Sequence, residues 1–141
     1  MNLRIAALSQ NESFARSTVA AFCASCNPTI EQLSDVKTAV SEAVTNSIVH
    51  GYDGKTGTIE ISARLVDRCI YLEISDDGIG IDDIEKAKKP FYTTRASDER
   101  SGMGFTVMES FMDKLEVTKR PSGGIAVAMS KNFDLKPALA E

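Results

Sequence analysis

The sequence predicts an α+β fold, a two-layer sandwich in which helices cover one face of a mixed, mostly antiparallel β-sheet. Two observations carry this prediction. Two long stretches with helical periodicity come first, and later segments alternate apolar and polar residues as half-buried strands do. No internal repeat and no linker divides the 141 residues. We therefore expect one domain over residues 1–133, followed by a frayed tail at 134–141.

The chain begins with a predicted strand and an amphipathic helix. Residues 3–7 alternate as in a short strand. Ser9 or Asn11 is expected to cap the helix, and Asn27-Pro28 to end it, because the residue before a proline avoids helical backbone angles. The apolar positions of this helix are Phe14, Val19, Phe22 and Cys26.

A longer helix is predicted next, running without a break to Gly51. Thr29 and Gln32 have the spacing of a capping box at its start. Its apolar positions recur every three or four residues: Ile30, Leu33, Val36, Val40, Val44 and Ile48.

The second half of the chain predicts four strands and one helix. Asp67-Arg68 is the expected turn between the first two strands. The polar segment 82–101 is longer than a simple connection, and loops of that length are usually lids or binding loops. The expected strands cover residues 58–63, 69–74, 113–119 and 124–130, and the helix covers 103–112.

Composition excludes several classes of function. The net charge of −4 argues against nucleic-acid binding, which selects clustered Lys and Arg. No apolar run approaches the ~20 residues that span a bilayer, so no membrane segment is expected. The first eight residues do not read as a signal peptide, which makes a cytoplasmic protein the expectation.

Cys23 and Cys26 form a C-x-x-C pair that is typical of a redox site or of half a zinc site. The pair ends a helix rather than starting one, so no helix dipole lowers a thiol pKa there. No second such pair exists, and His50 is the only histidine. Buried or half-buried structural thiols are the favoured interpretation.

Three features suggest chemistry, and the first lies on the long helix. Glu42, Asn46 and His50 are four residues apart and share a face beside the apolar stripe. An amide oxygen such as that of Asn46 suits Mg²⁺, and Glu42 can take a proton from an attacking hydroxyl. The alternative is that Glu42 caps a neighbouring turn and Asn46 bonds within its own helix.

The second feature is Asp76, which ends a predicted strand and is followed by Gly78 and Gly80. This carboxylate can accept a hydrogen bond from an amino group such as that of adenine, while the ring lies over glycines without side chains. Such a pattern also occurs by chance in many turns.

The third feature is the glycine pair Gly102 and Gly104, which flanks Met103 and opens a helix. Free N–H groups at a helix start bind anions, and the preceding Arg100 can reach a terminal phosphate. A tight loop-to-helix turn is the alternative interpretation.

The three features in this order resemble the ATPase fold of histidine kinases and gyrase. The resemblance is closer to its small stand-alone branch, the anti-sigma factor serine kinases, and extends from Leu3 to about Lys131. The motifs that carry it are Asn11 to Arg16, Val40 to Gly51, Asp76-x-Gly78-x-Gly80, Phe91-Tyr-Thr-Thr94 and Glu99 to Phe105.

This resemblance implies a role for each matched residue. Asn46 would ligate Mg²⁺, Glu42 would be the general base, and Asp76 would bind the adenine amino group. Arg100 would contact the γ-phosphate, and Arg16, expected to be exposed, would dock protein partners. The remaining residues implied to bind ATP or ADP are Gly78, Gly80, Thr94, Gly102, Met103 and Gly104.

The same resemblance implies partners and an activity. A homodimer would hold an RNA polymerase sigma factor and phosphorylate a serine of an anti-anti-sigma protein. Two alternatives are a binding module without catalysis and a detached histidine-kinase domain, although no phospho-accepting histidine helix is present. The branch that acts on stress sigma factors shares the same ATP-site residues.

Two positions depart from the family pattern. Family members usually carry Gly-Thr in the last strand, where the threonine hydroxyl supports adenine recognition, but here Ile125 follows Gly124. That hydrogen bond is therefore missing or supplied by another group. Arg95 replaces the lid's usual lysine. We expect altered nucleotide affinity rather than loss of binding.

Overall fold

The computed structural model describes residues 1–88 and 104–134. The strands are β1 (Asn2–Ala6), β2 (Thr58–Val66), β3 (Cys69–Asp76), β4 (Lys114–Lys119) and β5 (Ile125–Asn132). The α-helices are α1 (Gln10–Cys23), α2 (Ile30–Asn46), α3 (Ile84–Ala87) and α4 (Gly104–Phe111). Two short helical segments, a 3₁₀ turn at Ala24–Cys26 and a π-helix at Ser47–Gly51, follow α1 and α2.

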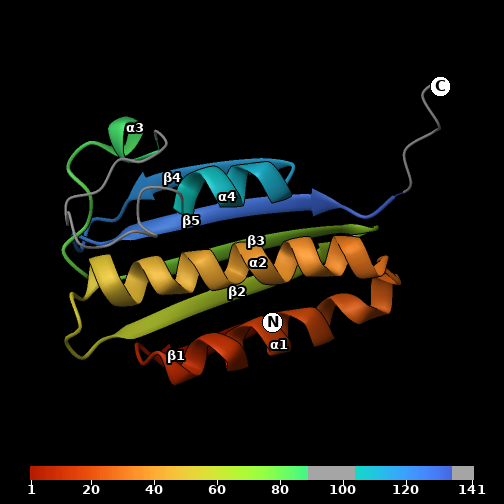
Figure 1. The fold of residues 1–141 in the computed structure, drawn as a ribbon, viewed down its shortest axis with the longest axis horizontal. Helices are drawn as coiled ribbons and strands as arrows, with labels where there is room; N and C mark the ends of the chain where they lie inside the picture. The colour runs from red at the N-terminus through yellow and green to blue at the C-terminus, as the bar shows by residue number, and fades with distance from the viewer. Residues whose placement is uncertain (89–103, 135–141) are drawn as a thin grey trace.

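The strands form one sheet of order β1-β2-β3-β5-β4, and α1, α2 and α4 lie together on one face of it (Figure 1). This arrangement confirms the predicted α+β sandwich. Every strand pairing among the described residues is antiparallel, so the sheet is simpler than the mixed one expected.

Alternation along β2 shows why the sheet has one covered face. Ile59, Ile61 and Ala63 are buried beneath the helices, while Ser62 and Arg64 between and beyond them are exposed. Val66 pairs with Cys69 across the predicted two-residue turn. Asp67 takes a φ of 56° there, a left-handed conformation that aspartate tolerates.

Helix α1 forms where predicted but differs in its cap and in its buried face. Ser9 occupies the N-cap position without a side-chain hydrogen bond, and the Asn11 amide instead donates to the Ala6 carbonyl. The buried residues of the helix are Ala15, Val19 and Cys23, which are four residues apart. Phe14 lies outside this stripe and is 54% exposed.

Helix α2 begins as the sequence predicts. The Gln32 N–H donates to Thr29 Oγ1 at 3.0 Å and the Thr29 N–H donates to Gln32 Oε1 at 2.9 Å, which completes the capping box. Val36, Val40 and Val44 are fully buried between the sheet and the neighbouring helices. The helix start therefore follows from local sequence, and its direction from the buried stripe.

The helical run ends at Gly51 as predicted, but its last turn is a π-helix instead of an α-helix. The α-helix stops at Asn46 rather than running to Gly51, and the Tyr52 N–H donates to the Ser47 carbonyl five residues earlier, as in a π-helix. This wider turn brings the buried residues Ser47 and Gly51 against Asp76, the last residue of β3, and both residues contact its carboxylate.

The first residues of the predicted lid form a short helix. Asp83 caps the short helix α3 by accepting a hydrogen bond from the Lys86 N–H at 3.0 Å. The remainder of the expected lid, and the predicted tail beyond Asp134, lie outside the described residues.

Candidate functional site

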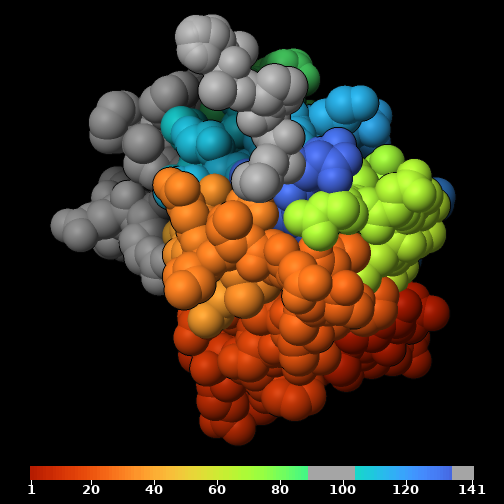
Figure 2. Space-filling model, turned by 90° about the vertical axis from the view of Figure 1, so that its right-hand side faces the viewer, coloured from red at the N-terminus to blue at the C-terminus, as the bar shows by residue number. Residues whose placement is uncertain are grey.

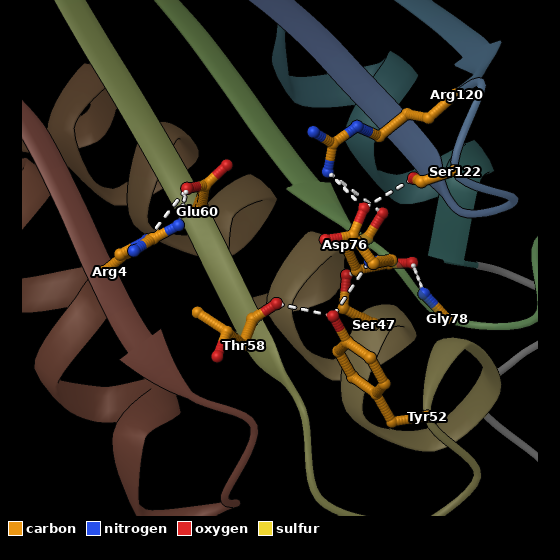
Figure 3. Close-up of polar contacts among 10 residues, drawn as sticks. Arg4, Ser47, Tyr52, Thr58, Glu60, Asp76, Gly78, Arg120 and Ser122 are labelled. Atoms are coloured by element: carbon orange, nitrogen blue, oxygen red, sulfur yellow. Dashed lines mark hydrogen bonds and ion pairs between the residues drawn. The ribbon is translucent and has the colours of Figure 1, made fainter.

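Asp76 ends β3 inside the protein, with only 1% of its surface exposed. The Ser47 hydroxyl donates to Asp76 Oδ2 at 2.6 Å, and the Gly78 N–H donates to Oδ1 at 2.9 Å (Figure 3). Each carboxylate oxygen thus holds one donor. An ionised carboxylate has about four acceptor positions, so acceptor capacity remains for a ligand.

Glycine backbones enclose this carboxylate. A Cβ at Gly124 would lie 2.0 Å from the Asp76 carbonyl oxygen, and a Cβ at Gly51 would lie 3.0 Å from Asp76 Oδ2. A Cβ at Gly78 would lie 2.0 Å from the Gly51 carbonyl oxygen. Side chains at these positions would push the three segments apart, which explains the need for glycine.

Gly80 has a similar packing role. Its φ is 77°, and a Cβ there would lie 2.1 Å from the Gly123 carbonyl oxygen. The sequence-based interpretation was that Gly78 and Gly80 leave room for a base, and that interpretation stays a prediction. The structure supplies an additional reason for both glycines, the close approach of neighbouring backbone.

The turn between β4 and β5 is attached to the end of β3 by Asp77. Ser122 Oγ donates to Asp77 Oδ1 at 2.6 Å, and Arg120 pairs with the same oxygen at 3.0 Å. Arg120 also donates to the Asp76 carbonyl at 3.2 Å (Figure 3). These contacts hold Gly124 against Asp76, and nothing in the sequence pattern indicated them.

A cavity of about 620 Å³ opens beside Asp76, within the range typical of small-molecule sites. Asn46 and His50 line it from the helix side, Gly80 lies after β3, and Ile125 lies at the start of β5. The structure thus brings Asn46, Asp76 and Gly80 together around one cavity, and their roles in ligand binding stay predictions.

Helix α4 closes the helix side of this site. A Cβ at Gly104 would lie 3.0 Å from both Nδ2 and Oδ1 of Asn46, so glycine lets α4 start directly against that amide. Glu42 stands one turn before Asn46 on α2 and is half-buried, and it does not line the cavity that the described residues form. Its assigned catalytic role stays a prediction.

Four predicted ligand-binding or catalytic residues cannot be placed. Thr94, Arg100, Gly102 and Met103 lie outside the described residues, as does most of the predicted lid.

Arg16 corrects a sequence-based expectation. The amphipathic pattern predicted an exposed side chain, but its side chain is only 34% exposed. Its guanidinium pairs with Glu12 at 3.0 Å on the same helix and donates to Ser41 Oγ at 3.1 Å on α2. These two acceptors, one on each helix, hold the long side chain. Its proposed docking role is not tested by this placement.

Ser47 was missed by the sequence analysis. Ser47 immediately follows Asn46 and is only 4% exposed. A hydroxyl this buried needs a hydrogen-bond partner. Ile125 is also buried, at 6% exposure, and brings no hydrogen-bonding group. The hydroxyl that contacts Asp76 therefore comes from the helix side rather than from β5.

The C-x-x-C pair has the properties of structural thiols. Cys23 and Cys26 are buried and free, and no cluster of three potential metal ligands occurs among residues 1–88 and 104–134. Burial raises the pKa of the Cys23 thiol to about 11, and the neighbouring Cys26 adds to the shift. A protonated thiol is a poor nucleophile and a poor metal ligand.

In the part of the chain that the structure describes, no helix is long and apolar enough to cross a membrane.

Comparison with known proteins identifies the class of this fold and site. Residues 5–131 match the family described as Histidine kinase-like ATPase domain, and the chain belongs to that family. Two solved structures share its fold. The RsbU and RsbW domains of Rv1364c from Mycobacterium tuberculosis align with a TM-score of 0.66 and 20% identity over 98% of this chain and 34% of that one. The catalytic domain of histidine kinase ThkA aligns with a TM-score of 0.62 and 15% identity over 94% and 96%.

Closer relatives narrow the class. A protein of Caldanaerobacter subterraneus named Anti-sigma F factor is 56% identical over 93% of this chain and 92% of its own length. Proteins of the same name from Clostridium acetobutylicum and Bacillus licheniformis are 54% and 50% identical over 96% and 99% of this chain and 94% and 96% of their own length. The chain is therefore a member of the anti-sigma F factor group within this family.

Proposed function

We propose that this protein is an ATP-dependent serine-protein kinase and anti-sigma factor, and that it sequesters a sporulation sigma factor of the sigma F type. The observation that carries the nucleotide part is the buried Asp76, an acceptor that lines the same cavity as Asn46. The relatives named Anti-sigma F factor support the partner assignment.

The residues of the cavity fit ATP with Mg²⁺. Asp76 keeps unused acceptor positions for an amino group, and the Asn46 amide oxygen is a hard ligand of the kind that Mg²⁺ takes alongside phosphates and waters. When bound, ATP would supply the phosphoryl group, and Mg²⁺ would neutralise the charge that develops on it. ADP carries the same adenine and would bind at the same residues.

The protein's own contribution is then placement and proton transfer. Glu42 would take the proton of a serine hydroxyl on the anti-anti-sigma partner, and Arg100 would contact the γ-phosphate. Gly102, Met103 and Gly104 would donate backbone N–H groups to the phosphates, and Thr94 would contact them from the lid. Arg16 would contact partners from α1, and the working form would be a homodimer.

Glu42→Gln tests the kinase assignment. The change keeps the shape of the side chain but removes its basicity, so serine phosphorylation should fall by about 100-fold or more. The measurement is transfer of labelled phosphate from ATP to an anti-anti-sigma protein, together with sigma binding by pull-down. Glu31→Gln, an exposed change in the first turn of the same helix, is the matched control and should leave transfer unchanged.

The outcomes separate the candidate functions. Nucleotide-dependent sigma binding by a wild type that transfers no phosphate would favour a non-catalytic binding module. Capture of a stress sigma factor instead of a sporulation one would assign the chain to the other branch.

A further inference from the structure

The bond between Ser47 and Asp76 is the shortest polar contact to the site carboxylate. Ser47 Oγ lies 2.6 Å from Asp76 Oδ2, and the two residues are 4% and 1% exposed. Hydrogen bonds from a hydroxyl to a carboxylate fall in this length range and are stronger than neutral ones. Water cannot easily replace this donor because both groups are buried.

The direction of this bond determines what the carboxylate can offer a ligand. A serine hydroxyl has one proton, and in the structure that proton goes to Asp76. The Gly78 N–H fixes the other oxygen at 2.9 Å. Two donors on different oxygens orient the carboxylate plane, and a carboxylate only accepts hydrogen bonds.

The β5 side of the cavity gives Asp76 no comparable side-chain support. Ile125 lines the cavity, is buried, and has no polar side-chain atom. The neighbouring Gly124 packs so closely that a Cβ there would lie 2.8 Å from Asp76 Oδ1. The hydrogen bonds to the carboxylate come from the Ser47 hydroxyl and the Gly78 N–H, so Ser47 is its single side-chain donor among the described residues.

We propose that Ser47 is a positioning residue that sets the base specificity of this site by holding Asp76 as an oriented acceptor. The inference rests on the proposed nucleotide function. Such an acceptor favours a purine with an amino group at position 6, which donates, over one with a 6-oxo group, which accepts. Ile125 makes the site dependent on Ser47 because it brings no second hydroxyl.

The test compares ATP with inosine triphosphate, which differs from ATP in carrying a 6-oxo group on the base. The dissociation constants of both are measured by calorimetry for the full chain and its variants. Ser47→Ala should weaken ATP binding about tenfold and leave inosine triphosphate binding almost unchanged, so the ratio of the two constants falls about tenfold. Ser130→Ala removes a buried serine on β5 away from the cavity, and it should keep the wild-type ratio.

A second variant distinguishes positioning from packing. Ile125→Thr in the Ser47→Ala background returns a hydroxyl to the other wall and should recover most of the ATP preference, with folding checked by thermal melting. An unchanged ratio in Ser47→Ala, or equal weakening for both nucleotides, would overturn the inference and leave the proposed function standing. A wild type that binds neither nucleotide would overturn the proposed function itself.

Discussion

The two ends of the helix layer, one beside Asp76 and the other beside Phe133, are built in opposite ways. At the site end, glycine backbones and a serine surround a buried carboxylate, and a cavity remains beside it. At the far end, which faces the viewer in Figure 2, the junction of α1 and α2 meets the β2–β3 turn and the end of β5. There Phe133 is fully buried and its carbonyl accepts hydrogen bonds from Arg68 and Gln32.

This difference separates stability from binding. The far end is filled by an aromatic ring and thiols. Arg68 also donates to the Cys26 carbonyl, which joins the β2–β3 turn to the 3₁₀ turn after α1. The site end gives up side-chain packing at several glycines and places a charged group inside the protein, which is unfavourable unless that group is hydrogen-bonded. We therefore expect changes at one end to alter unfolding and changes at the other to alter ligand affinity.

The largest expected effect is at the far end. Phe133→Ala should lower the free energy of unfolding by about 3–5 kcal/mol, because it removes a fully buried ring and leaves a cavity. Urea denaturation measures this loss. ATP affinity of the folded protein should stay within about twofold, and a large drop in affinity would show that the two ends are coupled.

Asp76→Asn is the corresponding change at the site end. The amide keeps an oxygen for the Gly78 N–H and can donate to Ser47, so folding should persist. Nucleotide affinity should fall by about 100-fold, since a hydrogen bond to a charged group contributes roughly 1.5–3 kcal/mol. Calorimetric titration with ATP checks this, and retained affinity would remove Asp76 from base recognition.

A smaller effect is expected at the capping box. Thr29→Ala removes the side-chain acceptor for the Gln32 N–H and should cost about 1 kcal/mol of stability without changing nucleotide affinity. Thr18→Ala, in the interior of α1 where the hydroxyl bonds only to the Phe14 carbonyl, is the control and should stay within about 0.5 kcal/mol. Equal losses from both variants would argue against a specific capping contribution.

The smallest effect at neutral pH concerns Cys23. Its folded pKa of about 11 lies above the ordinary value of 9.0, so the thiol form favours the folded state fully below pH 9, and this contribution fades as the pH rises towards 11. At pH 8 we expect iodoacetamide to leave Cys23 unmodified, whereas the half-buried Cys69 reacts. Mass spectrometry of the labelled peptides shows which of the two cysteines is modified. Rapid modification of Cys23 would show that the far end opens.

The sequence was most informative where structure depends on local pattern. The capping box at Thr29 and the turn at Asp67 follow from neighbouring residues, and both are confirmed. The predicted stripe of α2 is confirmed at Val36, Val40 and Val44, but Ile30 at its start is 91% exposed. Asn46, Asp76 and Gly80, which an ordered set of motifs indicated, line one cavity, and their binding roles stay predictions.

The rest depends on contacts between distant segments. The π-helix after Asn46 and the bond from Ser47 arise where α2 meets the end of β3, which no periodicity reveals. The attachment of Arg120 to Asp77 likewise joins residues from two different hairpins. Arg16 was expected to be exposed because its neighbours on α2 could not be seen from its own helix.

The wide turn at Ser47–Gly51 also limits how the chain can vary in length. Ser47 supplies the donor to Asp76, and Gly51 packs on the same carboxylate four residues later. Deleting one residue between them would rotate everything that follows about the helix axis and would turn Gly51 away from the carboxylate. A substitution at Ile48 or Val49 alters one side chain, whereas a change in residue number alters every position after it. Aligned relatives should therefore vary in identity between Ser47 and Gly51 but not in the spacing of these two residues.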